Sequence, residues 1–376
     1  MHEKKGLKIT RIFLLTLQTI PALMNLILLW FKISKMFQTR NTILFSILTL
    51  LLLMALLMNI SLGQVAIPFK EVIKSLFGAT ASKDTWEYII INFRLPKAIT
   101  AVLVGIGLSI SGLLMQTLFR NPLAGPYVLG LSSGSSLGVA FVILGAGVLP
   151  TVVSTFLLSS YGIILASCLG SFSVLLLVLL ISKFLRDTMT ILIAGLMFSS
   201  FAGAIVSVLT FFSSAEKLQK FTFWSLGSIG NLSWQNISIL LVAVSIGLLL
   251  SLFSVKSLDA LLLGENYAKS LGLKVKKSRR LIILATSILA GSITAFAGPI
   301  AFVGLAVPHL SKLLFQTSNH RILFWSTILI GAIIMLFCDM VSQMPGFDFT
   351  LPINAITSIV GAPVVIWLLV RKNRLV

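Results

Sequence analysis

The sequence predicts an all-α polytopic membrane protein with about ten transmembrane helices. Of its 376 residues, 57% are hydrophobic and only 10% are charged, which is more apolar surface than a soluble core can bury. Apolar runs of roughly 20 residues, the length of a membrane span, follow one another along the chain. The net charge of +19 does not indicate nucleic-acid binding, because the cations lie in short loops between the apolar runs.

The predicted membrane domain covers residues 41–376. Its spans are expected at residues 42–60, 94–118, 127–149, a fourth that ends near 181, 188–212, 235–255, 281–297, 299–315, 322–341 and 351–370. Short surface helices are expected after Pro68 and within residues 215–233. Residues 1–40 form an N-terminal extension for which three interpretations stay open: an additional span, a helix on the membrane surface, or a true translation start at Met36. The extension lacks the small-residue cleavage site of a signal peptide.

The distribution of cations predicts the orientation of the chain. If Arg40 lies inside and the spans alternate, 18 cations fall on the cytoplasmic side and 7 on the outer side. Both termini and residues 257–280 are then cytoplasmic, and residues 94–97 lie outside. An Ala-Gly-Pro break occurs twice, at residues 124–126 and 297–299. In this topology the first break lies inside and the second outside, which is the arrangement expected of an inverted internal repeat.

Small residues mark several predicted spans. The fifth carries Gly195, Ser199, Gly203 and Ser207 four residues apart, and the third contains a serine-rich cluster at residues 132–136. Such residues at membrane depth suit either close helix packing or the wall of a water-lined path. The sequence does not separate these two interpretations.

The chain shows no pattern for catalysis or metal binding. It has no phosphate-binding loop, and its three histidines have no companion ligands at metal spacing. Cys168 and Cys338 are expected to be small buried side chains without a disulfide. Asp339 is the only acid in a predicted span, and its place near the outer end favours a structural cap or a helix–helix hydrogen bond over a proton relay. We therefore expect the energy for any transport to come from another protein.

Residues 257–280 form the longest polar interruption in the second half of the chain. They are expected to form two short amphipathic helices separated at Gly264, followed by a basic run at residues 274–280. One interpretation is a loop that its cations hold to anionic lipid. The other is a platform on which a cytoplasmic ATPase subunit docks.

Five motifs resemble the FecCD-type permeases, the membrane subunits of ABC importers for iron-siderophores, haem and vitamin B12. They are RLPKAITAVLVGIGLSISGLLMQTLFRNPLAGPYVLGLSSGSSLG (94–138), LDALLLGENYAKSLGL (258–273), AGPIAFVGLAVPHLSKLL (297–314), NHR (319–321) and LPINAITSIVGAPVVIWLL (351–369). The resemblance covers about residue 41 to the C-terminus. It implies a type II ABC importer permease fold, a second permease copy as a homodimer, a separate cytoplasmic ABC ATPase and an extracytoplasmic substrate-binding protein.

The resemblance also implies roles for particular residues. The coupling segment, residues 257–280, would contact the ATPase through Leu258, Asp259, Gly264, Glu265, Ala268 and Gly272. Docking of the binding protein would use Arg94 and Lys97. Thr188 and Met189 match the inner gate, and the small residues Gly195, Ser199 and Gly203 of the same span are our candidates for the wall of the translocation path. Gln343, Thr350 and Asn354 depart from the family pattern, so docking could rely on fewer charges or on Lys70, Lys74 or Lys83 instead.

The function that these expectations favour is import of a metal chelate across a bacterial inner membrane, with iron-siderophore as the first candidate and haem or cobalamin as others. The chain itself would be no enzyme and would bind no cofactor, since its partner would hydrolyse the ATP. A stand-alone secondary transporter is the main alternative, and ion-driven uptake without an ATPase would identify it. A membrane scaffold is a second alternative, and labelling of cysteines placed at residues 132–136 would test whether that region is wetted.

Overall fold

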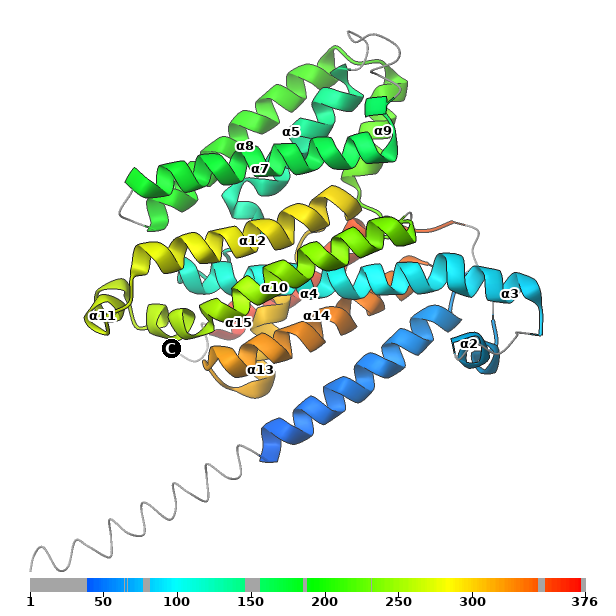
Figure 1. The fold of residues 1–376 in the computed structure, drawn as a ribbon, viewed down its shortest axis with the longest axis horizontal. Coiled ribbons are helices and arrows are strands. Elements are labelled where there is room, and N and C mark those ends of the chain that lie inside the picture. Colours follow the sequence, from blue (N-terminus) through cyan, green and yellow to red (C-terminus); the bar gives the residue numbers. More distant parts are fainter. Residues whose placement is uncertain are drawn as a thin grey trace, which may run out of the picture. The chain divides into compact units, whose positions relative to one another are not determined.

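The computed structural model of the chain describes residues 39–63, 65, 67–76, 82–145, 156–184, 188–230, 232–343 and 349–372. All regular structure in this part is helical (Figure 1). The chain divides into two compact units, Met1–Leu50 and Leu51–Val376. The expected extension over residues 1–40 lies almost wholly outside the described residues, and the described end of the first unit, residues 39–50, is helical.

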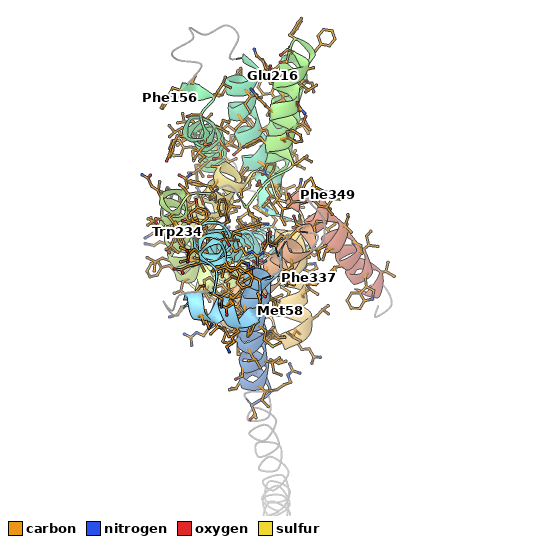
Figure 2. The ribbon with its side chains drawn as sticks, turned by 90° about the vertical axis from the view of Figure 1, so that its right-hand side faces the viewer. Met58, Phe156, Glu216, Trp234, Phe337 and Phe349 are labelled. Carbon is orange, nitrogen blue, oxygen red and sulfur yellow. The ribbon has the colours of Figure 1, made fainter. Side chains whose placement is uncertain are left out.

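Seven described helices are long and apolar enough to cross a membrane. They are Thr39–Ser61, Asp84–Leu118 (α3, Asp84–Ile89; η1, Ile90–Arg94; α4, Leu95–Leu118), α7 (Ser160–Phe184), α8 (Thr188–Phe211), α10 (Trp234–Leu262), α12 (Val275–Ala297) and α14 (His320–Ser342). Three further apolar helices are α5 (Leu131–Ile143), α13 (Val303–Phe315) and α15 (Ile353–Lys372). Large apolar side chains such as Phe156, Trp234 and Phe337 are exposed on the surface (Figure 2). The prediction of an all-α polytopic membrane protein is confirmed.

Short polar helices lie between the membrane helices. The two surface helices expected from the sequence are α2 (Phe69–Leu76) and α9 (Ala215–Ser225), and α11 (Glu265–Ser270) follows α10. The expected break between the sixth span and the coupling segment does not occur. α10 continues through Val255 to Leu262 and ends just before Gly264, whose positive φ of +117° a helix cannot contain. The coupling segment is thus the end of a long helix plus α11, and the prediction of two separate short helices was wrong.

α4 lies at the centre of the second unit, where it packs against α10, α12, α13 and α14. Two glycines on α4 allow close backbone contact. A Cβ at Gly105 would lie 2.3 Å from the carbonyl oxygen of Gly331 on α14, and one at Gly112 would lie 1.7 Å from that of Gly304 on α13. The small residues of this helix therefore serve close helix packing.

The two Ala-Gly-Pro breaks meet in the interior. Tyr127, on the 3-10 helix η2 (Pro126–Leu129), donates its hydroxyl to the Ile300 carbonyl and accepts from the Ile300 N–H at 3.1 Å. Their expected placement at opposite membrane faces is therefore wrong. Each break precedes a helix of only 13 residues, about 20 Å long, so the irregular segment must itself enter the membrane region.

Asn354 gives the second break a further polar partner. Its side-chain oxygen accepts from the Ala301 N–H at 3.0 Å. Irregular backbone at membrane depth needs such partners, because lipid supplies none. This contact explains a departure from the family pattern that the sequence left without a reason.

Candidate functional site

The coupling segment is built on two glycines with left-handed backbone. Gly264 has φ of +117° and ends α10, while Gly272 has φ of +82° and ends α11. A side chain at either position would be strained, so these turns require glycine. No atom lies within 4 Å of a Cβ placed at Gly272, whereas one at Gly264 would lie 3.1 Å from the guanidinium of Arg120. The two turns set where α11 begins and ends between α10 and α12.

Several bonds hold the coupling segment to the membrane helices. Arg120, just beyond α4, donates to the Leu261 carbonyl at 3.1 Å. Glu265 forms an ion pair with Arg279 of α12 at 2.6 Å. Within the segment, the side chains of Leu258 and Ala268 are buried. The segment is therefore attached on two sides, through Leu261 to Arg120 beyond α4 and through Glu265 to α12.

A histidine connects three helices at the same level. His320, at the start of α14, has its Nδ1 2.7 Å from the Asp259 carboxylate on α10 and its Nε2 2.8 Å from the Thr117 hydroxyl on α4. The His320 backbone N–H also donates to Asp259 at 2.9 Å. No role for His320 was predicted, and its only signal in the sequence was its place in the Asn-His-Arg motif. The Asp259 carboxylate thus bonds to the start of α14, although its side chain is still partly exposed.

The exposed part of the coupling segment is apolar. Leu263, Tyr267 and Leu271 lie four residues apart and are each more than half exposed. A cavity of about 600 Å³ lies beside them, and its lining includes Arg120 and Met189. Clustered exposed apolar side chains are typical of a surface that contacts another protein or the membrane. These three side chains, more than the buried Leu258 and Ala268, are placed to touch a partner.

The predicted gate residues divide into two groups along α8. Met189 is exposed beside the coupling segment, and Thr188 begins the helix, although its side chain lies outside the described part. Gly195 and Ser199 pack against Gly130, where a Cβ would lie 3.1 Å and 3.2 Å from their oxygen atoms. Gly203 is open, with no atom within 4 Å of a Cβ placed there. Part of the small-residue stripe therefore serves packing, and a gating role stays a prediction.

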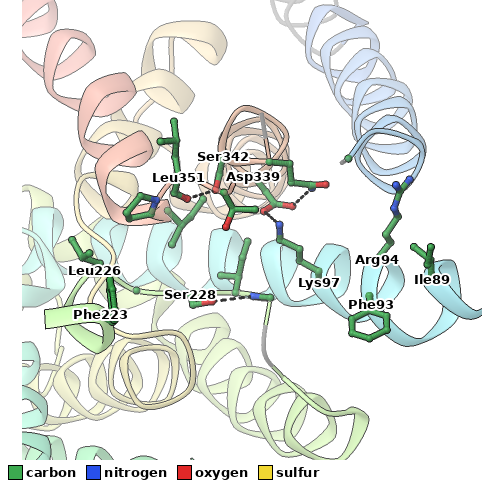
Figure 3. Close-up of a pocket in the computed structure, with 18 of the residues that line it drawn as sticks. Ile89, Phe93, Arg94, Lys97, Phe223, Leu226, Ser228, Asp339, Ser342 and Leu351 are labelled. Carbon is green, nitrogen blue, oxygen red and sulfur yellow. Dashed lines mark hydrogen bonds and ion pairs between the residues drawn. The ribbon is translucent and has the colours of Figure 1, made fainter. Parts of the chain in front are cut away.

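A cavity of about 650 Å³, at the end of the helices that is expected to face outward, contains both predicted docking residues. Lys97 forms an ion pair with the buried Asp339 at 3.0 Å (Figure 3). The other carboxylate oxygen of Asp339 accepts from the side-chain amides of Asn59 and Gln343, both at 2.9 Å. Asp339 therefore contacts three side chains, those of Lys97, Asn59 and Gln343. These contacts agree with the helix–helix hydrogen bond expected for this residue.

Arg94 lies in the wall of the same cavity but is only 8% exposed. Its guanidinium donates to the carbonyls of Ile60 at 2.8 Å and Ser61 at 2.7 Å, and also to that of Val65. Arg94 therefore fixes the turn after the helix Thr39–Ser61. Its use in docking stays a prediction, and the charges of both predicted docking residues already have internal partners.

Among the described residues, no group of three or more His, Cys, Asp or Glu side chains could hold a metal ion. His309 lies inside α13, and Cys168 and Cys338 are free thiols.

Comparison with known proteins identifies the family. The FecCD transport family matches residues 50–371. The chain is 34% identical over 330 residues to the hemin transport system permease protein HmuU of Yersinia pestis, covering 87% of this chain and 95% of that protein. It is also 34% identical over 330 residues to the vitamin B12 import system permease protein BtuC of Klebsiella pneumoniae, with 87% and 93% covered.

Solved structures agree with this family. An inward-facing metal-chelate type ABC transporter is 31% identical, with a TM-score of 0.76 over 87% of this chain and 99% of that chain. PsaBC from Streptococcus pneumoniae, with a TM-score of 0.52 at 18% identity, shares the fold alone. The predicted type II ABC importer permease fold is confirmed. The chain belongs to the FecCD transport family.

Proposed function

We propose that this chain is the permease subunit of an ATP-driven importer that moves a metal chelate across a bacterial inner membrane. Haem, cobalamin and iron-siderophores are the candidate cargoes, with iron-siderophore first. The relatives named for hemin and vitamin B12 and the metal-chelate type neighbour support this class of substrate. The ATP is hydrolysed by a separate ABC subunit, and the permease contributes two stable helix arrangements and contacts at both faces.

The observation that carries this proposal is the geometry of the coupling segment. Its exposed apolar residues offer an interface, and its buried bonds lead directly to the helices of the membrane body. Leu263, Tyr267 and Leu271 are exposed, while Asp259 bonds to His320 and Arg120 bonds to Leu261. A push on α11 would therefore be transmitted through rigid contacts to α4, α12 and α14.

Co-purification with its partner ABC ATPase tests the proposal. Tyr267→Ala/Leu271→Ala removes two exposed anchors, and interface anchors of this kind contribute about 2 kcal/mol each, so we expect affinity to fall by about 1,000-fold. Phe184→Ala, which removes a still more exposed apolar side chain at the end of α7, is the control. Glu265→Arg is unsuitable, because it would place a second cation against Arg279. Unchanged co-purification of the double variant would contradict the proposed interface.

On the outer side, the proposal assigns docking of a substrate-binding protein to cations without a buried partner. Lys70 and Lys83 are exposed on the outer surface, and Lys83 lies 4.9 Å from the ring of Trp86. Lys74 is paired with Glu71 at 2.9 Å. Exposed cations on this face suit acidic residues of a partner. Loss of binding-protein affinity in Lys70→Glu/Lys83→Glu, and not in Lys217→Glu, would support this assignment.

A second copy of the chain would complete the translocation path. α8 is apolar along its length, yet only 17% of its span is buried within the described chain. Covering such a helix with the same helix of another copy would place Met189 and Gly203 at a shared interface. Cross-linking of Gly203→Cys between copies would test this arrangement.

A stand-alone secondary transporter remains the alternative from another class, and Asp339 is the observation that bears on it. A proton relay needs a carboxyl group that is free to exchange its proton, whereas this carboxylate is held by Lys97, Asn59 and Gln343. The contacts therefore favour the ATP-driven importer. Uptake driven by an ion gradient in vesicles that lack the ATPase would support the alternative instead.

A further inference from the structure

A groove runs between α7 and α12 on the surface of the second unit. The two helices lie side by side and antiparallel, with the end of α7 beside the start of α12 (Figure 1). Two cavities occupy the groove, one of about 610 Å³ near the start of α12 and one of about 350 Å³ further along. The helices come close together at the smaller cavity, where a Cβ at Gly291 would lie 3.2 Å from the Ser171 hydroxyl.

Both walls of the groove are apolar. The α7 wall is a stripe of exposed side chains three or four residues apart, namely Leu165, Leu169, Phe172, Leu176 and Leu180. The α12 wall has the same helical spacing, with Leu281, Leu284, Ile288 and Ser292. From Lys277 to Ser292 the groove is about 22 Å long, which exceeds the roughly 15 Å hydrocarbon depth of one leaflet. One full acyl chain therefore fits along it.

Two cations stand at one end of the groove. Lys277 and Arg280 line the larger cavity, and the cation distribution places this end at the cytoplasmic surface. Among the described residues, neither forms an ion pair with an acid, whereas Arg279 between them is paired with Glu265. The basic run is thus divided: Arg279 holds the coupling segment, and Lys277 and Arg280 face the groove.

We propose that this groove is a binding site for an anionic phospholipid of the cytoplasmic leaflet. Its phosphate lies at Lys277 and Arg280, and one acyl chain follows the apolar walls. The acyl chain brings little selectivity, because lipid tails are as apolar as leucine. The headgroup brings the selectivity, because cations at the cytoplasmic surface attract anionic lipids. The site does not depend on the cargo and would persist if the proposed substrate class were wrong.

The proposal also relates the lipid to the coupling segment. Lys277 and Arg280 lie within one turn of Arg279, which bonds to Glu265 at the start of α11. A bound phosphate would fix the first turn of α12 and so the position of that ion pair. An anionic lipid is thereby placed beside the segment through which an ATPase would act.

Native mass spectrometry of the purified full chain tests the site. The chain is incubated in mild detergent with equal amounts of dioleoylphosphatidylglycerol and dioleoylphosphatidylcholine. We expect the anionic lipid to be retained about 25-fold better, from roughly fivefold for each cation. Lys277→Gln/Arg280→Gln should reduce this preference to near parity. Lys274→Gln/Lys276→Gln removes the same charge from exposed positions outside the groove and should keep the preference.

A second variant tests the apolar part. Leu284→Trp fills the groove and should lower the retention of both lipids while leaving the cations in place. The proposal is overturned if Lys277→Gln/Arg280→Gln keeps the full preference, or if both charge variants lose it equally, since that would reflect general surface charge. Displacement of the lipid by millimolar inorganic phosphate would indicate a simple anion site and would also overturn it. Wild-type protein without bound lipid, together with loss of the dimer in Leu284→Trp, would show that a second copy covers this groove, which would equally overturn the proposal.

Discussion

The buried ion pair between Lys97 and Asp339 offers the sharpest test of the outer-face geometry. We expect Lys97→Met to destabilise the protein strongly, because it leaves a fully buried carboxylate without its counter-charge. At the observed 3.0 Å, the Coulomb energy at an effective dielectric constant of 20 is about 5.5 kcal/mol. Desolvation offsets part of this, and removal of one partner of a buried pair costs about 3–5 kcal/mol.

A double variant separates the charge from the hydrogen bonds. The substitution Asp339→Asn would keep a side-chain oxygen that accepts from Asn59 and Gln343 but would need no cation. Lys97→Met/Asp339→Asn should therefore recover most of the stability that Lys97→Met loses, giving a coupling energy of about 2 kcal/mol or more. The matched control is Lys220→Met, which breaks an ion pair of similar length, 2.9 Å, between exposed side chains, and should leave stability unchanged.

Thermal unfolding in detergent, followed by the reaction of the native cysteines with a fluorogenic maleimide, measures these effects. Cys338 is 1% exposed and adjoins Asp339, so it reports opening of this region directly. We expect the Tm of Lys97→Met to fall by roughly 5–10 °C. Equal losses in Lys97→Met and in the double variant would refute the reasoning, since the cost would then not come from an uncompensated charge.

Two further predictions follow from local geometry. Gly112→Ala should prevent stable assembly of α4 with α13, because its Cβ would lie 1.7 Å from the Gly304 carbonyl, whereas Gly203→Ala, with no atom within 4 Å, should purify and unfold as the wild type. The backbone N–H of Ser82 holds the pKa of Glu71 at about 2, below its usual 4.5, so the stabilisation is complete above pH 4.5 and is lost as the pH falls towards 2. Limited proteolysis of the α2 region should show this acid sensitivity in the wild type and none in Glu71→Gln.

The sequence allowed the all-helical membrane fold and the turn at Gly264 to be predicted, because apolar runs and glycine positions are local signals. The continuation of α10 to Leu262 was missed because polar Lys256 and Asp259 were taken as the end of a span, although neither residue disfavours a helix. A helix ends at a residue that breaks or caps it, and for α10 that residue is Gly264.

Contacts between distant segments could not be predicted in the same way. The meeting of Tyr127 with Ile300 and the role of Asn354 depend on how short helices enter the membrane region, which no local pattern encodes. Lys97 and Asp339 were both expected near the outer face, yet their pairing across 242 positions of sequence appears only in the folded chain. The expected position of Lys97 and Asp339 at the same depth in the membrane was the one signal that could have suggested this pairing.

The central claim is that energy reaches this chain from a separate ATPase through the coupling segment. Uptake of a metal chelate into vesicles that contain the permease, its ATPase and its binding protein tests this claim most directly. We expect uptake that requires ATP and is lost in Tyr267→Ala/Leu271→Ala, while Phe184→Ala transports normally. Uptake that continues without the ATPase, or that follows an ion gradient in the double variant, would contradict it.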